Sequence, residues 1–263
     1  MKKLISLILS AALVLCGCSS LVPARTTAPT ETAYTEPETE AAEPETEPVT
    51  EETAAEEESS EPTEAEPSEP IDSHTLFVGD SHTYNFVSCY LERRDLLNGA
   101  KYIGVCGFDI QRFDDPDALI GTGGMGDVAM VYSPEFEGLN YADAIASAED
   151  INKIYLMLGT NHSDQADFNA YKGMLDQILE SQPDAVIYLQ TIPVAKSGGI
   201  AVNAVNQAIH DVCDYYSSSG IDHVVLLDTY TAIGPYGNGA DGLHLSEEYG
   251  MRSWYECIME NVS

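Results

Sequence analysis

Short apolar runs alternate with helix-forming segments through the last 191 residues of this chain, and that alternation limits the folds open to it. The runs are apolar almost throughout, which is typical of parallel strands buried on both faces. The predicted strands span residues 75–79, 101–105, 154–158, 185–191 and 223–227, and the predicted helices span residues 81–97, 141–149, 166–180, 201–216 and 247–261. The expected fold is α/β, with a five-stranded parallel sheet covered by helices on both faces.

Residues 108–138 follow this pattern poorly. They hold a glycine-rich stretch at 121–126 and one possible short strand at 128–132. The 191 residues are still enough chain for one domain with a sizeable core, so we expect residues 73–263 to form it.

The start of the chain has the form of an export signal. Two lysines precede an apolar run at residues 4–15 that is broken only by two serines, and the run is too short to span a bilayer comfortably. It ends in Leu15-Cys16-Gly17-Cys18, which resembles the bacterial lipobox. That resemblance implies a signal peptide at residues 1–17 and a lipidated Cys18 that holds the protein on the outer face of a bacterial membrane.

Residues 18–72 are predicted to be a disordered tether. From residue 19 they carry 16 glutamates and Asp72 against one base, Arg25, together with eight prolines. Such a segment buries too little apolar surface to offset the entropy of ordering. An acidic tail that binds a partner is the alternative interpretation.

The overall charge argues against some partners. The full chain has a formal net charge of −33, which repels nucleic acids and anionic membrane surfaces. Residues 73–263 hold 27 acidic and 8 basic side chains, so we also expect neutral esters to be better substrates than anionic ones.

Four short motifs lie at predicted strand ends or before the last helix, where ligands of parallel α/β sheets bind. Gly79-Asp80-Ser81 would place a serine hydroxyl at a helix N-terminus, although alone it reads as a helix cap. Gly107 and Asn161 follow the second and third strands and, taken singly, are ordinary turn residues. Asp241 precedes His244 by three residues, a spacing that lets the carboxylate orient the imidazole toward a serine.

In combination, these motifs resemble the SGNH (GDSL-like) hydrolase superfamily across nearly all of the 191 residues. The resemblance implies a flavodoxin-like three-layer α/β/α sandwich and ester hydrolysis without a cofactor or metal. It assigns Ser81 as the nucleophile, His244 as the general base and Asp241 as its orienting carboxylate. The N–H groups of Ser81 and Gly107 and the Asn161 amide would form the oxyanion hole. The family usually has Asp after that asparagine, and this chain has His162.

The other candidate residues are weaker. We expect His82 to lie at the substrate edge or in solvent. We expect Cys89, Cys106, Cys213 and Cys257 to be free thiols, although Cys89 and Cys257 are placed to meet. No phosphate loop, EF-hand or zinc motif is present.

The sequence therefore predicts a membrane-anchored serine esterase with a monomeric domain that acts on small-molecule or glycan esters, short-chain O-acetyl groups first among them. A carbohydrate O-acyltransferase with the same site is one alternative. A non-catalytic surface-binding lipoprotein is the other, and the complete set of five site residues argues against it.

Overall fold

The computed structural model describes residues 69–262. The predicted signal peptide, Cys18 and all but the last four residues of the predicted tether lie outside this range. Among the residues that it covers, no helix has both the length and the apolar character needed to cross a membrane.

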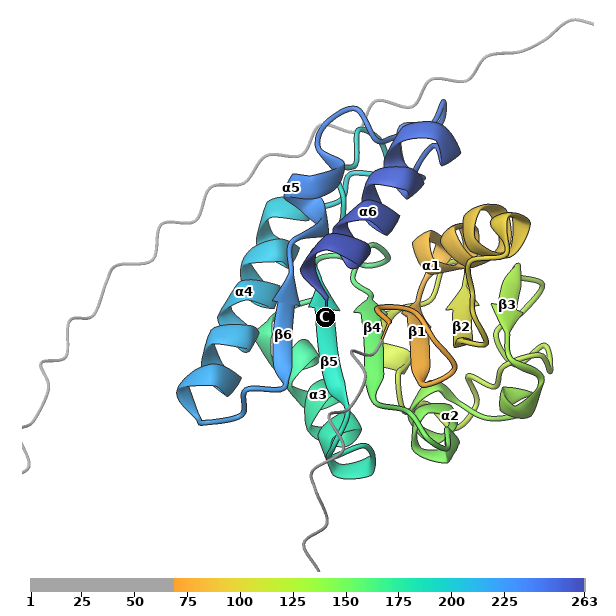
Figure 1. Cartoon of the computed structure of the whole chain (residues 1–263), viewed down its shortest axis with the longest axis vertical. Helices are drawn as coiled ribbons and strands as arrows, with labels where there is room; N and C mark the ends of the chain where they lie inside the picture. The colour runs from red at the N-terminus through yellow and green to blue at the C-terminus, as the bar shows by residue number, and fades with distance from the viewer. Residues whose placement is uncertain (1–68, 263) are drawn as a thin grey trace, which may run out of the picture. The chain divides into compact units, whose positions relative to one another are not determined.

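A six-stranded sheet forms the centre of the domain (Figure 1). Its strand order is β3-β2-β1-β4-β5-β6. The strands are β1 (Thr75–Gly79), β2 (Lys101–Val105), β3 (Met130–Tyr132), β4 (Lys153–Met157), β5 (Val186–Gln190) and β6 (Val224–Leu227). All neighbouring pairs are parallel except β2 and β3. Without β3, the order of the five parallel strands is the flavodoxin-like one, so the predicted fold class is confirmed.

The prediction of five strands was wrong by one. β3 is a three-residue antiparallel edge strand, within the stretch that the sequence marked only as a possible strand. It is half-buried and follows the glycine-rich segment, so it lacks the long apolar run that identifies the five central strands.

Helices cover both faces of the sheet. The longest are α3 (Phe168–Ser181), α4 (Val202–Ser218) and α6 (Arg252–Asn261), and Figure 1 shows α6 in front of the sheet and α3 behind it. The shorter ones are α1 (Ser81–Asn85), η1 (Phe86–Leu91), η2 (Glu92–Arg94), η3 (Ile110–Arg112), η4 (Pro134–Phe136), α2 (Tyr141–Ser147), α5 (Thr229–Ile233) and η5 (Glu247–Met251). The predicted helix 81–97 corresponds to α1, η1 and η2 and ends at Asp95, which has a left-handed φ of 57°.

Stacked aromatic rings link the central strands to each other and to a helix. Phe77, Tyr155 and Tyr188 occupy matching positions on β1, β4 and β5, with ring centroids 5.0 and 5.2 Å apart. Phe86 meets Phe77 edge-on and stacks on Trp254 of α6 at 4.1 Å. Offset and edge-to-face contacts of this kind each add about 0.5–1.5 kcal/mol beyond the burial of apolar area.

The domain starts before the predicted boundary at Ser73. Ile71 is buried, and the Asp72 carboxylate accepts a 2.7 Å hydrogen bond from Lys153, whose side chain is 6% exposed. The Tyr155 hydroxyl donates to the Pro70 carbonyl. A buried lysine is costly without a partner, so Asp72 is part of the folded domain.

Candidate active site

Ser81 occupies the first position of α1, directly after the carboxyl end of β1. The strand ends at Gly79, where an added Cβ would lie 2.1 Å from the Thr83 Oγ1 and 2.4 Å from the Met157 carbonyl oxygen. Asp80 caps the helix, because its carboxylate accepts a 3.0 Å hydrogen bond from the His82 N–H. The tight turn therefore presents the Ser81 hydroxyl at the edge of the sheet.

Ser81, His244 and Asp241 form one hydrogen-bonded chain. The Ser81 Oγ lies 3.0 Å from the His244 Nε2, and the His244 Nδ1 lies 2.7 Å from the Asp241 Oδ2. The other Asp241 oxygen accepts hydrogen bonds from the N–H groups of Leu243 and His244. These bonds and the His244 ring lower the pKa of Asp241 to about 2, so the carboxylate is ionised wherever it faces an imidazolium.

The loop that follows β5 supports the turn that carries Asp241 and His244. The Lys196 N–H donates to the Gly242 carbonyl at 2.7 Å, and the Ser197 hydroxyl donates to the Asp241 carbonyl at 2.9 Å. Asn238 adds a third tie, since its amide donates to the carbonyls of Val194 and Leu243. Residues about 160 positions after Ser81 are held opposite it in this way.

The backbone N–H groups of Ser81 and Gly107 have no acceptor within residues 69–262. Gly107 lies in the turn after β2 with a φ of +76°, and an added Cβ there would meet nothing within 4 Å. Its N–H is therefore free to donate to a ligand.

The Asn161 side chain joins the β1 and β2 turns. Its amide donates to the Phe108 carbonyl at 3.0 Å and lies 3.4 Å from the Asp80 Oδ2. Phe108 directly follows Gly107, so the structure brings the Asn161 amide close to that turn. The 3.4 Å contact to Asp80 is the weaker of the two, because hydrogen bonds weaken with distance.

Asp80 is fully buried beside the proposed nucleophile. Burial raises the pKa of its carboxyl to about 6, although the hydrogen bond from the His82 N–H opposes that shift. The Asp80 carboxylate contacts the Asn161 amide and the N-terminus of α1, so it holds these two parts of the site together.

The expectation that His82 faces substrate or solvent was wrong. Its side chain is 3% exposed, and its Nδ1 is buried without a hydrogen-bond partner. The centroids of the His82 and His244 rings are 5.8 Å apart. Burial, reinforced by His244, lowers the pKa of the imidazole to about 3. Sequence position alone could not reveal this burial, because it depends on the groups that pack over the ring.

His162 directly follows Asn161 in the loop after β4. It has a left-handed φ of 48°, and its Nδ1 lies 2.7 Å from the Asp109 carboxylate. Asp109 in turn caps η3 by accepting from the Gln111 N–H. His162 therefore ties the loop after β4 to the loop after β2.

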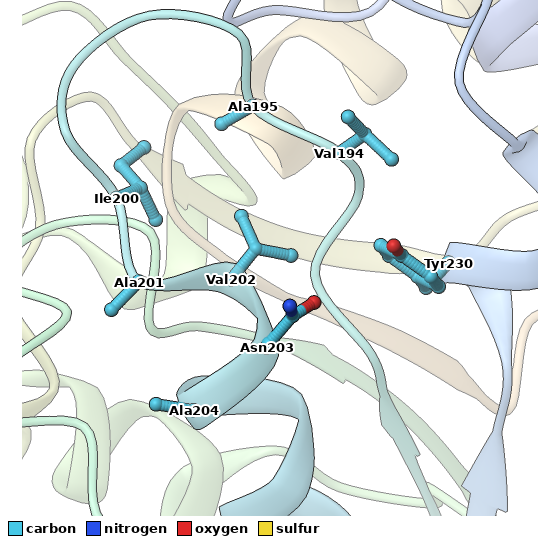
Figure 2. Close-up of a pocket in the computed structure, with 8 residues that line it drawn as sticks. All are labelled: Val194, Ala195, Ile200, Ala201, Val202, Asn203, Ala204 and Tyr230. Carbon is cyan, nitrogen blue, oxygen red and sulfur yellow. The ribbon is translucent and has the colours of Figure 1, made fainter.

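A cavity of about 480 Å³ lies under the loop 194–201, and Figure 2 shows Ile200, Val202 and Tyr230 directed toward it. The cavity is lined by none of the three residues of the Ser81 chain. It shares the loop 194–201 with the site.

In the described part of the chain, no cluster of three or more His, Cys, Asp or Glu side chains is arranged to hold a metal ion. Cys89, Cys106, Cys213 and Cys257 are all free thiols. Cys106, next to Gly107, is half-buried, and burial raises the pKa of its thiol.

Comparison with known proteins gives likenesses of structure alone. No family model and no curated protein sequence matches the chain. A carbohydrate esterase family 3 structure from Talaromyces cellulolyticus matches with 17% identity and a TM-score of 0.46, covering 70% of this chain and 93% of that one. A lipolytic G-D-S-L family protein from Veillonella parvula matches with 17% identity and a TM-score of 0.45, covering 71% and 96%. The catalytic domain of the Streptococcus pneumoniae peptidoglycan O-acetyltransferase A matches with 14% identity and a TM-score of 0.44, covering 72% and 91%. Likenesses of this size do not identify a function, which has to come from the site.

The buried imidazole of His82 makes a prediction about acid stability. Below pH 6.5 the unfolded chain protonates His82, whereas the folded chain does so only near pH 3. His82 therefore makes the free energy of unfolding fall as the pH drops from about 6.5 to about 3, by about 3 kcal/mol at pH 4.5. The variant His82→Leu lacks this loss and should gain on the wild type over that window, as measured by urea unfolding at several pH values.

The raised pKa of Asp80 has the opposite effect, because it makes the free energy of unfolding rise as the pH drops. The wild type and the variant must therefore be compared with each other at each pH. His210→Leu, which removes an exposed imidazole, is the matched control. Parallel pH curves for the wild type and His82→Leu would show that the His82 ring is not held neutral.

Proposed function

We propose that this protein is a serine esterase that cleaves carboxylic esters through an acyl-enzyme. The observation that carries the proposal is the continuous hydrogen-bonded chain from the Ser81 hydroxyl through His244 to Asp241. A serine hydroxyl is a weak nucleophile until a base takes its proton, and the His244 imidazole at 3.0 Å is placed to do so.

In the proposed mechanism, the Ser81 Oγ attacks the acyl carbonyl carbon while its proton passes to the His244 Nε2. The Asp241 carboxylate stabilises the imidazolium that forms. Collapse of the tetrahedral intermediate breaks the bond to the alcohol oxygen, which takes the proton back from His244. Water, activated by the same nitrogen, then releases the acid and restores Ser81.

The negative charge on the carbonyl oxygen needs donors. The free N–H groups of Ser81 and Gly107 and the Asn161 amide are proposed to supply them. The Ser81 N–H also lies at the start of a helical segment that continues from α1 into η1, where the partial positive charge of the helix end favours an anion.

The acyl group is proposed to be short and the alcohol to belong to a glycan. The open surroundings of Gly107 suit an exposed, hydrated substrate. The same acyl-enzyme can pass its acyl group to a sugar hydroxyl, so an acceptor sugar belongs in every assay. Acetylated sugar forming as acetate release falls would identify a transferase.

The first test removes the nucleophile and the base. Ser81→Ala and His244→Ala should each abolish ester turnover and keep the circular dichroism spectrum of the wild type. The double variant should be little slower than either single one, because the two residues act in one step. Losses that add up on a logarithmic scale would contradict a shared mechanism. A fluorophosphonate should label the wild type and leave Ser81→Ala unlabelled.

The second test concerns Asn161→Ala. Loss of one oxyanion donor should lower kcat by roughly 10²- to 10³-fold with little change in KM, because the donor acts only when charge develops on the oxygen. Thermal unfolding of the same variant checks that its tie to Phe108 has not cost the fold. A normal kcat with a raised KM would reduce Asn161 to a residue that binds ground-state substrate.

The location of the enzyme is proposed from the lipobox-like residues that end at Cys18. A lipid on Cys18 would anchor the chain to the extracytoplasmic face of a bacterial membrane, and the acidic segment would let the domain reach its substrate. Cys18→Ala should move the protein from the membrane fraction to the soluble fraction and keep its kcat/KM on soluble esters. Retention in the membrane fraction would contradict the anchor.

A further inference from the structure

Lys196 differs from every other basic side chain in residues 69–262. Acidic side chains outnumber basic ones more than threefold in this range, and seven of the eight Lys and Arg side chains form ion pairs. Lys196 is exposed and pairs with no carboxylate there. In so acidic a domain, a cation without a carboxylate partner is available for an anion from outside.

Lys196 also lies against the site. Its N–H donates to the Gly242 carbonyl at 2.7 Å, and its Cβ would lie 3.4 Å from a Cβ added at Gly242. Gly242 stands between Asp241 and His244 in the chain. The far end of the same loop is tied to the Asn161 side of the site, where the Ala201 N–H donates to the Ser163 hydroxyl. The loop that carries Lys196 therefore contacts both the Asp241–His244 turn and the loop that carries Asn161.

An exposed aromatic ring accompanies this cation. The Lys196 Nζ lies 6.0 Å from the centre of the Tyr236 ring, and Tyr236 is 85% exposed. Tyr236 lies two residues before Asn238, whose amide ties the loops at Val194 and Leu243. A flat ring with an electron-rich face suits the C–H face of a sugar, and a neighbouring ammonium suits a carboxylate on it.

We propose that Lys196 and Tyr236 bind an acidic sugar of the substrate, with Lys196 pairing to its carboxylate and Tyr236 packing against its ring. The proposal rests on the esterase function and names the substrate class for that site. It runs against the preference for neutral esters expected from net charge, because Lys196 would contact the sugar carboxylate directly, whereas salt screens the field of charges beyond about 8 Å.

The test compares two esters that differ only in one carboxylate, methyl tri-O-acetyl-β-glucuronoside and methyl tri-O-acetyl-β-xyloside. Lys196→Gln keeps the backbone N–H that supports the Asp241 turn and changes only the charged side chain. In the full chain it should lower kcat/KM for the glucuronoside by about two- to fivefold, the range of an exposed ion pair, and leave the xyloside unchanged. Lys196→Glu should lower it further. The effect should shrink as salt is raised.

Lys172→Gln is the matched control. Lys172 lies 5.3 Å from the centre of the exposed Tyr215 ring but belongs to α3 and pairs with Asp176. The Lys172→Gln variant removes one positive charge at a position outside the Asp241 turn. It should therefore leave the ratio of the kcat/KM values for the two esters unchanged. Equal effects of the two variants would mean that Lys196 acts only through the net charge of the domain, and this would overturn the proposal.

Tyr236→Ala tests the ring. It should raise KM for both esters with kcat kept, whereas Tyr215→Ala should change neither. A rise in kcat/KM for both esters in Lys196→Gln would also overturn the proposal. It would mean that Lys196 normally holds an acidic segment of the chain itself, which blocks the site until the charge is removed.

Binding separates this proposal from the esterase function. An unesterified glucuronic-acid oligosaccharide, titrated by NMR, should bind the wild type about two- to fivefold more tightly than Lys196→Gln. Hydrolysis of both esters with equal binding by the two proteins would reject the acidic sugar and keep the esterase. Binding that depends on Lys196 without hydrolysis of either ester would reject the esterase and keep the sugar site.

Discussion

The turn from β1 into α1 has no space for a side chain at Gly79, and the arrangement around Ser81 depends on that close contact. A Cβ at this position would overlap Thr83 of the helix and the Met157 carbonyl of β4. With glycine, the helix starts immediately beyond the strand, and the Tyr141 hydroxyl donates to the Gly79 carbonyl. Ser81, two residues after Gly79, is 6% exposed, and its hydroxyl lies 3.0 Å from the His244 Nε2.

The second half of the site depends on contacts made far from Ser81 in the chain. The Asp241 to His244 turn is short and half-exposed, and its position is set by hydrogen bonds to Asn238, Lys196 and Ser197. Two of these three residues belong to the loop after β5. A parallel sheet places the ends of β1, β4 and β5 along one edge, which is why loops so distant in sequence can share one reaction.

Burial sets the charge states around the nucleophile. The carboxyl of Asp80 and the imidazole of His82 flank Ser81 in the chain, and loss of water shifts both toward their neutral forms. Asp241, on the exposed side, accepts backbone hydrogen bonds and keeps its charge. The charged groups of the site are thus on the solvent side, where the imidazolium of His244 would form.

Local patterns in the sequence predicted the five parallel strands and the main helices, because apolar runs and turn motifs depend on near neighbours. The residues that meet at Ser81 came from the resemblance of four motifs in combination to a known family, since each motif alone reads as an ordinary cap or turn. The local patterns marked β3 only as a possible strand and missed α5, because both are too short to show a period. They also missed the place of Asp72, which depends on a lysine 81 residues away. They also misjudged His82, since helical position says nothing about which neighbours pack over a side chain. Only the tertiary structure could decide the burial of His82 and the isolation of Lys196, because both are set by groups that approach from distant parts of the chain.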